Sequence, residues 1–242
     1  VDDIFSTFLY KGNSGTQTIT NGIDLSGEGG LVWFKNRTTT VGVPLGNVLQ
    51  DTVRGKTKFN RSQSTSAEET SNNMITSFNS NGFAISDDTN INYNNDTEVS
   101  WTFRKATGFF TIKEYTGSGS TQSLTHDLGS IPGCIIVKRT DSTADWGVYH
   151  RGQNGGVDPE DYRLRLNSTT TENNDTYWGD TAPTATHFTV GDAHTEVNLS
   201  GATYIAYIFA GGESSAATAR SVLFAGNAAN GNSQYSFMNT AN

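Results

Sequence analysis

The sequence predicts an all-β protein made of two consecutive, similar antiparallel β-sandwich domains of the jelly-roll or lectin-like kind. Short segments rich in β-branched and aromatic residues, bounded by Gly, Asn, Asp or Pro, recur along the 242-residue chain. Such segments are typical of strands. The segments of the first half return in the same order in the second. Only 17% of the residues are charged, against roughly 25% in ordinary soluble domains, which indicates a surface rich in turns.

Eight strands are predicted in the first half, with one weakly helical stretch among them. That stretch, residues 66–74, is too short and too polar to carry a fold. The predicted strands are residues 8–12, 16–20, 30–35, 41–51, 56–61, 74–80, 82–86 and 99–105.

The second half contains six predicted strands. In YRLRLNS the Tyr and Leu residues alternate with Arg163 and Arg165, so we expect an apolar face on a core and both arginines in water. TYIAYIFAG lacks polar alternation over most of its length, which predicts an inner strand covered on both faces. The six segments are residues 110–117, 134–140, 145–151, 162–168, 187–191 and 203–211.

The correspondence between the two halves predicts the domain boundaries. A repeat of this length is a whole small β domain, since solenoid units run roughly 20 to 50 residues. We expect one domain at residues 1–106 and a second at 107–212. Residues 213–242 change to small and polar types and are interpreted as a linker or the start of a further segment. The matching segments are 16–20 with 121–125, 30–35 with 133–138, and 97–103 with 203–209.

Composition excludes several classes of partner. The net charge of −8 and only 16 Lys and Arg residues argue against nucleic acid, because that affinity depends on basic side chains. No run approaches the roughly 20 apolar residues that span a bilayer, so no membrane insertion is expected. Cys134 is the single cysteine, which rules out an intrachain disulfide and a multi-cysteine metal site. Its neighbours predict a buried, small apolar side chain.

An ordered series of phrases resembles a known family. GSGSTQSLTHDLGSIPGCIIVKRTD, ADWGVYHRG, WGDTAPTATHFTVG and GATYIAYIFAG occur in the second half, and GGLVWFKNR, DTVRG and ITSFNSNGFAI in the first. Over residues 8–212 the chain is similar to a tandem domain of tail-fibre and other virion structural proteins of marine bacteriophages, including cyanophages. The resemblance implies a β-sandwich on the particle surface, other virion proteins as partners and a role in host attachment.

The assembly and function of such a protein follow as expectations. Fibres of this kind are commonly homotrimers, so a trimer is favoured, with a glycan of the host surface as a further partner. A secreted, monomeric carbohydrate-binding module is the alternative function, and a capsid-decorating or horn-like virion component is a lesser one. The resemblance implies no catalytic residues.

The residues themselves do not predict an enzyme. Asp158, Glu160 and Asp161 are neighbours in a Pro-containing turn, which is typical of a solvated loop. A glycosidase needs two carboxyl groups facing each other across a cleft. The four histidines lack the spacing of a zinc site, and no Ser lies in a nucleophile-elbow context. We expect no catalytic residue.

One loop could hold a structural calcium ion, the only cofactor considered. Hard cations bind clustered oxygen ligands, but an Asp/Asn-rich turn whose side chains cap their own backbone is favoured. The EF-hand pattern fails, because Tyr93 stands where it needs Gly and Val99 where it needs Glu. The candidate ligands are Asp87, Asp88, Asn90, Asn92 and Asp96.

Glycan binding requires an exposed aromatic ring on which the apolar face of a sugar stacks. Strand alternation predicts that Trp33, Trp101 and Trp146 are buried, and Trp178 matches a core position of the first half. The remaining candidate is Tyr177, followed by Tyr93 and Tyr162.

Overall fold

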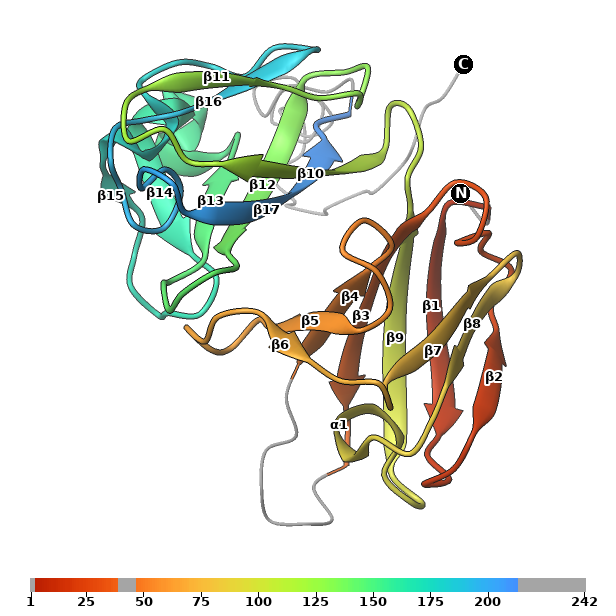
Figure 1. Ribbon diagram of the computed structural model, residues 1–242. Helices are drawn as coiled ribbons and strands as arrows, with labels where there is room; N and C mark the ends of the chain where they lie inside the picture. The colour runs from red at the N-terminus through yellow and green to blue at the C-terminus, as the bar shows by residue number, and fades with distance from the viewer. Residues whose placement is uncertain (1–2, 39–46, 213–242) are drawn as a thin grey trace, which may run out of the picture.

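The computed structural model describes residues 3–38 and 47–212, and this part of the chain is almost entirely β-structure (Figure 1). All of its strand pairs are antiparallel. The predicted all-β class is therefore confirmed. We call residues 3–105 the N-terminal half and residues 106–212 the C-terminal half. The prediction for residues 213–242, and the first part of the predicted strand 41–51, lie outside the described residues.

Two sheets form the N-terminal half. The six-stranded sheet has the order β1 (Phe5–Lys11), β9 (Thr97–Arg104), β3 (Gly30–Asn36), β4 (Val48–Asp51), β5 (Lys58–Arg61), β6 (Glu69–Thr70). The smaller sheet has the order β2 (Gln17–Thr20), β8 (Gly82–Ile85), β7 (Ile75–Asn79). Apolar side chains of both sheets, among them Phe34 and Phe83, share one buried cluster. Such a cluster between two sheets is the core of a sandwich.

The C-terminal half repeats this order of strands. Its large sheet is β10 (Phe110–Thr116), β17 (Thr203–Ala210), β12 (Pro132–Arg139), β13 (Gly147–His150), β14 (Tyr162–Arg165), β15 (Asn173–Asn174). Its small sheet is β11 (Gln122–Thr125) with β16 (His187–Val190). The 3-10 turns are η1 (Gln153–Gly156), η2 (Pro159–Asp161) and η3 (Thr176–Trp178). A second buried cluster lies inside this half.

A third buried cluster joins the halves. It combines Leu31 and Leu49 of the N-terminal half with Trp146, Ile205 and Tyr207 of the C-terminal half, among others. All five side chains are fully buried. The division into two independent domains thus stays a prediction, because one part of the core is shared.

Two local predictions are resolved by these elements. Strand β17 is central in its sheet and buried over most of its length, as its uniform apolarity predicts. The weak helix predicted at residues 66–74 is wrong, since Glu69–Thr70 form the edge strand β6. The short helix α1 (Thr89–Asn92) forms instead, because Asp88 caps it by accepting a hydrogen bond from the Asn90 amide. No helix of the described residues is long and apolar enough to cross a membrane.

The alternation in β14 has the predicted phase but not the predicted environment. Leu164 and Leu166 pack together at the margin of the third cluster. Arg163 and Arg165 do not point into open water, since their side chains are only 13% and 27% exposed. Arg163 forms an ion pair of 2.6 Å with Asp175. The expectation is wrong because both faces of the strand are covered, one of them by the other half of the molecule.

Candidate functional site

The tyrosines predicted as glycan platforms do not form one. Tyr177 is 2% exposed and belongs to the core of the C-terminal half, so the prediction that it is exposed is wrong. The guanidinium of Arg163 lies 4.8 Å from the centre of its ring, and the His194 ring lies 4.7 Å away. Tyr93 and Tyr162 are half-buried and lie in different halves. The three rings therefore do not gather on one face.

The tryptophans differ in their burial. Trp146 and Trp178 are buried, as predicted, with at most 1% exposed. Trp33 and Trp101 are only half-buried, so the prediction for these two is wrong. Their rings meet edge to face at 6.3 Å between centres, on the face of the first large sheet that points away from its own core. The strand pattern predicts that they share a face, but it does not show that this face is incompletely covered.

The side chains of the predicted calcium loop serve separate contacts. Asp88 caps α1 and also accepts a hydrogen bond of 3.2 Å from Ser71. Asn90 accepts one of 2.7 Å from Arg61, and Asp87 is exposed. Asn92 and Asp96 are fully buried in contacts of their own. Among the described residues no three His, Cys, Asp or Glu side chains lie together as metal ligands. The calcium ion stays a prediction, and the contacts of Asp88 match the alternative interpretation, a self-capping turn.

Two buried asparagines hold equivalent loops together in the two halves. In the N-terminal half the Asn92 side-chain oxygen accepts hydrogen bonds from Gln17 (2.6 Å) and from the amide of Asn13 (2.9 Å). In the C-terminal half the Asn198 oxygen accepts them from Gln122 (2.8 Å) and from the amide of Ser118 (2.9 Å). The repeated Thr-Gln phrase thus has a structural role, since its glutamine reaches a buried amide.

The junction between the halves holds a buried network of polar side chains. Arg54 and Asp51, both from the N-terminal half, are buried, with side chains 2% and 0% exposed. Arg54 Nε donates to Asp51 Oδ2 at 2.7 Å, and Arg54 Nη2 donates to the hydroxyl of Tyr207 at 2.8 Å. That hydroxyl donates to Asp51 at 2.9 Å. Glu68 accepts from Arg54 Nη1 at 3.1 Å. Arg54, Asp51 and the Tyr207 hydroxyl therefore close a ring across the junction, and Glu68 is attached to it through Arg54.

Burial sets the ionisation of this ring. Burial acts to lower the pKa of Arg54, but the charge and hydrogen bond of Asp51, together with the charge of Glu68, outweigh burial and hold this pKa above its usual value. The pKa of Tyr207 is raised well above 10.0, first by burial. Arg54 is thus a permanent cation and Tyr207 a permanent hydroxyl donor. A buried network with all members paired fixes one geometry, because any other leaves a charge unpaired.

A loop of the N-terminal half docks on the C-terminal sheet beside this ring. The indole nitrogen of Trp146 donates to the carbonyls of Arg61 (3.2 Å) and Ser64 (3.1 Å). The carbonyl of Thr65 accepts from the backbone amide of Ala144 at 2.9 Å and from Lys138 Nζ at 3.4 Å. The two halves thus share hydrogen bonds as well as apolar contacts.

Two surface hollows flank the junction. The larger has a volume of about 410 Å³ and is lined by Glu68, Glu114, Tyr115, Thr116, Thr140, Thr203 and Tyr204. Partial burial raises the pKa of Glu114, and the charges of Asp51 and Glu68 add to this effect. The hydroxyls and carboxylates that line this larger hollow can form hydrogen bonds with a polar ligand. Tyr115 and Tyr204 are buried and offer no stacking face.

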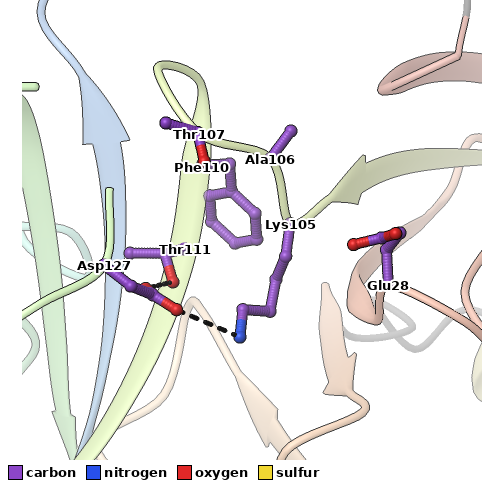
Figure 2. Close-up of a pocket in the computed structure, with 7 residues that line it drawn as sticks. All are labelled: Glu28, Lys105, Ala106, Thr107, Phe110, Thr111 and Asp127. Atoms are coloured by element: carbon purple, nitrogen blue, oxygen red, sulfur yellow. Dashed lines mark hydrogen bonds and ion pairs between the residues drawn. The ribbon is translucent and has the colours of Figure 1, made fainter. Parts of the chain in front are cut away.

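The smaller hollow lies where the chain passes from one half to the other. Figure 2 shows Lys105 extended between Asp127 and Glu28. Lys105 Nζ lies 3.6 Å from Asp127, which also accepts a hydrogen bond from Thr111. The volume of about 140 Å³ is far below the roughly 300–1,000 Å³ of ligand pockets. This ion pair connects Lys105, the last residue of the N-terminal half, to the C-terminal half.

Comparison with known proteins assigns a family. A family described as a domain of unknown function (DUF7483) matches residues 2–241. The chain belongs to this family. No curated protein and no solved structure matches the chain.

The DUF7483 match covers both halves in a single stretch. The junction therefore lies inside the family unit, between its two copies of the same strand order. The junction leaves no pattern in the sequence, because Arg54 and Tyr207 are 153 positions apart. One available signal was Tyr207, whose hydroxyl lies in the middle of a mostly apolar inner strand.

Proposed function

We propose that the chain is a structural module of a bacteriophage virion, in a tail fibre or similar appendage that contacts the host. Other virion proteins are the proposed partners, and the particle surface is the proposed location. The sequence resemblance to virion structural proteins is the first support. The second is physical, and it lies in the junction.

The observation that carries the proposal is the buried ring of Arg54, Asp51 and Tyr207. An appendage transmits force between a particle and a cell, so consecutive modules must keep a fixed relative orientation. Apolar contacts alone tolerate repacking, whereas a buried charge network penalises every arrangement that breaks it. Together with the third apolar cluster, the ring suits a stiff element of a shaft or tip. It performs no chemistry in this role, and we propose a structural and not an enzymatic function.

The test is detection on purified particles of the phage whose genome encodes the chain. We expect mass spectrometry to find the chain in the particles and gold-labelled antibodies to mark the appendage. The purified chain should also slow adsorption of the phage to its host if it carries the contact surface. A chain absent from purified particles would overturn the proposal. Label on the capsid shell would instead favour the capsid-decorating or horn-like alternative.

A secreted carbohydrate-binding module is the second candidate, and the larger hollow favours it. Three threonines and two glutamates line this hollow, and such groups hydrogen-bond to sugar hydroxyls. A glycan array would reveal binding that Thr203→Val and Glu114→Gln remove and that the exposed control Asp87→Asn leaves intact. Binding by a chain that is absent from particles would establish this function in place of the first.

A further inference from the structure

Strand β1 has an open edge. It lies at the end of the first large sheet and pairs with β9 alone (Figure 1). The carbonyl of Ile4 accepts from Arg104, and the amide of Gly12 donates to Asp96, both at 2.8 Å. Even-numbered residues therefore face β9. In an antiparallel strand the alternate residues face the other side, so Phe5, Thr7 and Leu9 present their backbone groups to the open edge. No strand of the described chain pairs with it; the Gln17 side chain donates to the outward carbonyl of Lys11 at 3.2 Å.

The equivalent edge of the C-terminal half carries charged side chains at its centre, whereas the centre of β1 carries none. Strand β10 has Lys113 and Glu114 where β1 has Phe8 and Leu9, at the 105-residue offset of the paired strands. Charged side chains on an edge strand prevent pairing with another chain. Leu9 is instead 59% exposed. The two halves thus differ at the positions that determine whether their edge strand can pair with another chain.

An apolar face continues from this edge. Leu9 and Thr7 lie beside Val99 and Trp101 in the neighbouring strand. Trp101 contacts Trp33, and Trp33 reaches the margin of the cluster that joins the halves. Leu9 and Thr7 are exposed, both tryptophans are half-buried and Val99 is buried. This face thus runs from the open edge to the established interface between the halves. The composition of this face resembles the apolar, aromatic centre of protein–protein interfaces.

We propose that β1 pairs with β1 of a second copy of this chain, antiparallel about a twofold axis with Thr7 opposite Thr7. Each hydrogen-bonded pair then joins residues of the open edge, as the antiparallel ladder requires. Leu9 lies opposite Phe5 on the apolar face. Lys11 lies opposite Asp3, and both are exposed. The twofold axis repeats this ion pair, so the strand is complementary to itself in charge.

The neighbouring register is less favourable. Shifting the axis by one residue to Phe8 places Phe5 opposite Lys11 and removes both ion pairs. The proposed register makes one continuous sheet from two six-stranded ones. The contact between the two β1 strands does not depend on the proposed virion role. It predicts a dimer, whereas the sequence resemblance favours a trimer.

Light scattering after size-exclusion chromatography tests the pairing. We expect the molar mass of the full chain to rise with concentration toward twice 26.1 kDa. Leu9→Glu should keep it at the single-chain mass, since it places on β1 the residue that β10 carries at Glu114. Glu114→Gln, the matched change on the other edge, should leave the association intact. Equal thermal unfolding of these variants excludes misfolding. A single-chain mass at all concentrations, or three times 26.1 kDa, would overturn the proposal.

Charge exchange tests the register. Asp3→Lys and Lys11→Asp should each weaken the association roughly 2- to 30-fold, since exposed pairs contribute about 0.2–1 kcal/mol each and two pairs are lost. The double variant restores opposite charges and should recover most of the affinity. A double variant no better than the singles contradicts the assignment of Asp3 opposite Lys11.

Cysteine crosslinking locates the axis. In a Cys134→Ala background, Thr7→Cys should form an intermolecular disulfide under mild oxidation, because paired Cα atoms lie about 5.5 Å apart. Leu9→Cys faces Phe5 of the second copy and should crosslink far more slowly. Equal rates for the two variants would reject the axis at Thr7.

Discussion

Gln17 and Asn92 are joined by a side-chain hydrogen bond of 2.6 Å, although 75 positions separate them. The same bond joins Gln122 and Asn198 at 2.8 Å in the other half. Each asparagine is fully buried and also donates to loop carbonyls, those of Gly15 and Ser120 among others. The bond between the two side chains therefore ties the start of the second strand of each half to the segment before its last strand.

Removing either asparagine should destabilise the protein by similar amounts. Asn92→Ala and Asn198→Ala each remove the partner of several loop backbone groups, which costs about 2–3 kcal/mol at these sites. Denaturant unfolding of the two variants measures the loss. Asn94→Ala is the control, since Asn94 is exposed and its change should stay within about 0.5 kcal/mol. A loss at only one of the two sites would show that the equivalent bonds are not equally important.

Breaking the ring at the junction should cost more. Arg54→Met leaves Asp51 as an unpaired charge in the interior, while Glu68 keeps its ion pair of 2.8 Å with Lys58, and we expect the unfolding free energy to fall by about 3–5 kcal/mol. Tyr207→Phe removes only the bridging hydroxyl and should cost about 1–3 kcal/mol. Arg37→Met at an exposed arginine is the matched control. An Arg54→Met variant as stable as the control would mean that the ring does not hold the halves together.

Local pattern predicted the strands of this chain well, because strand preference is a property of a few adjacent residues. The uniform apolarity of TYIAYIFAG predicted its central position in the sheet. The Thr-Gln repeat indicated duplication, but its purpose depends on Asn92 and Asn198, which are distant in sequence. Contacts of that range leave no trace in residue spacing.

The errors share one physical cause. Alternation distinguishes the two faces of a strand, but it cannot tell water from another part of the protein. Arg163 and Trp33 were therefore assigned the wrong surroundings. Tyr177 lies in a polar stretch, yet the 3-10 turn η3 carries it into the core. The buried ring of Arg54 could not be predicted, since it needs the relative placement of both halves.

Glu98 should make stability depend on pH. Burial raises its pKa to about 8, with a further contribution from Asp96, while Asn36 donates to both carboxylates, at 2.7 Å to Glu98 and 2.9 Å to Asp96. The second oxygen of Glu98 has no partner. Because the pKa of Glu98 is higher in the folded than in the unfolded state, its contribution to stability is fully present below the unfolded pKa of 4.5. This contribution is lost as pH rises through about 8.

Glu98→Gln removes this dependence. Relative to the wild type, the variant should gain stability between pH 4.5 and 8, by at most about 1.4 kcal/mol for each unit of the shift. Denaturant unfolding at several pH values measures the difference, with Asp87→Asn, an exposed carboxylate, as the control. A constant difference across this range contradicts the assignment.

Lys138 should make stability rise with pH at higher pH, which is opposite to the effect of Glu98. It is fully buried at the junction, where Nζ donates to the carbonyl of Arg139 at 2.8 Å. Burial lowers its pKa to about 8, and repulsion by Arg139 and Arg54 adds to this, against the attraction of Asp145 and Asp141. The folded protein thus releases this proton near pH 8, whereas the unfolded chain keeps it up to about 10.5.

Between these two pH values the unfolded state binds more protons, so the lysine contribution to stability must rise with pH. Lys138→Met lacks the titrating group, and the wild type should gain stability relative to it from pH 8 to 10.5. Lys113→Met, on the half-exposed face of β10, is the matched control and should run parallel to the wild type. Tyrosines that ionise in this range are common to all three proteins and cancel in the differences. If Lys138→Met also runs parallel to the wild type, the ammonium group of Lys138 is hydrated, and the junction admits water at this point.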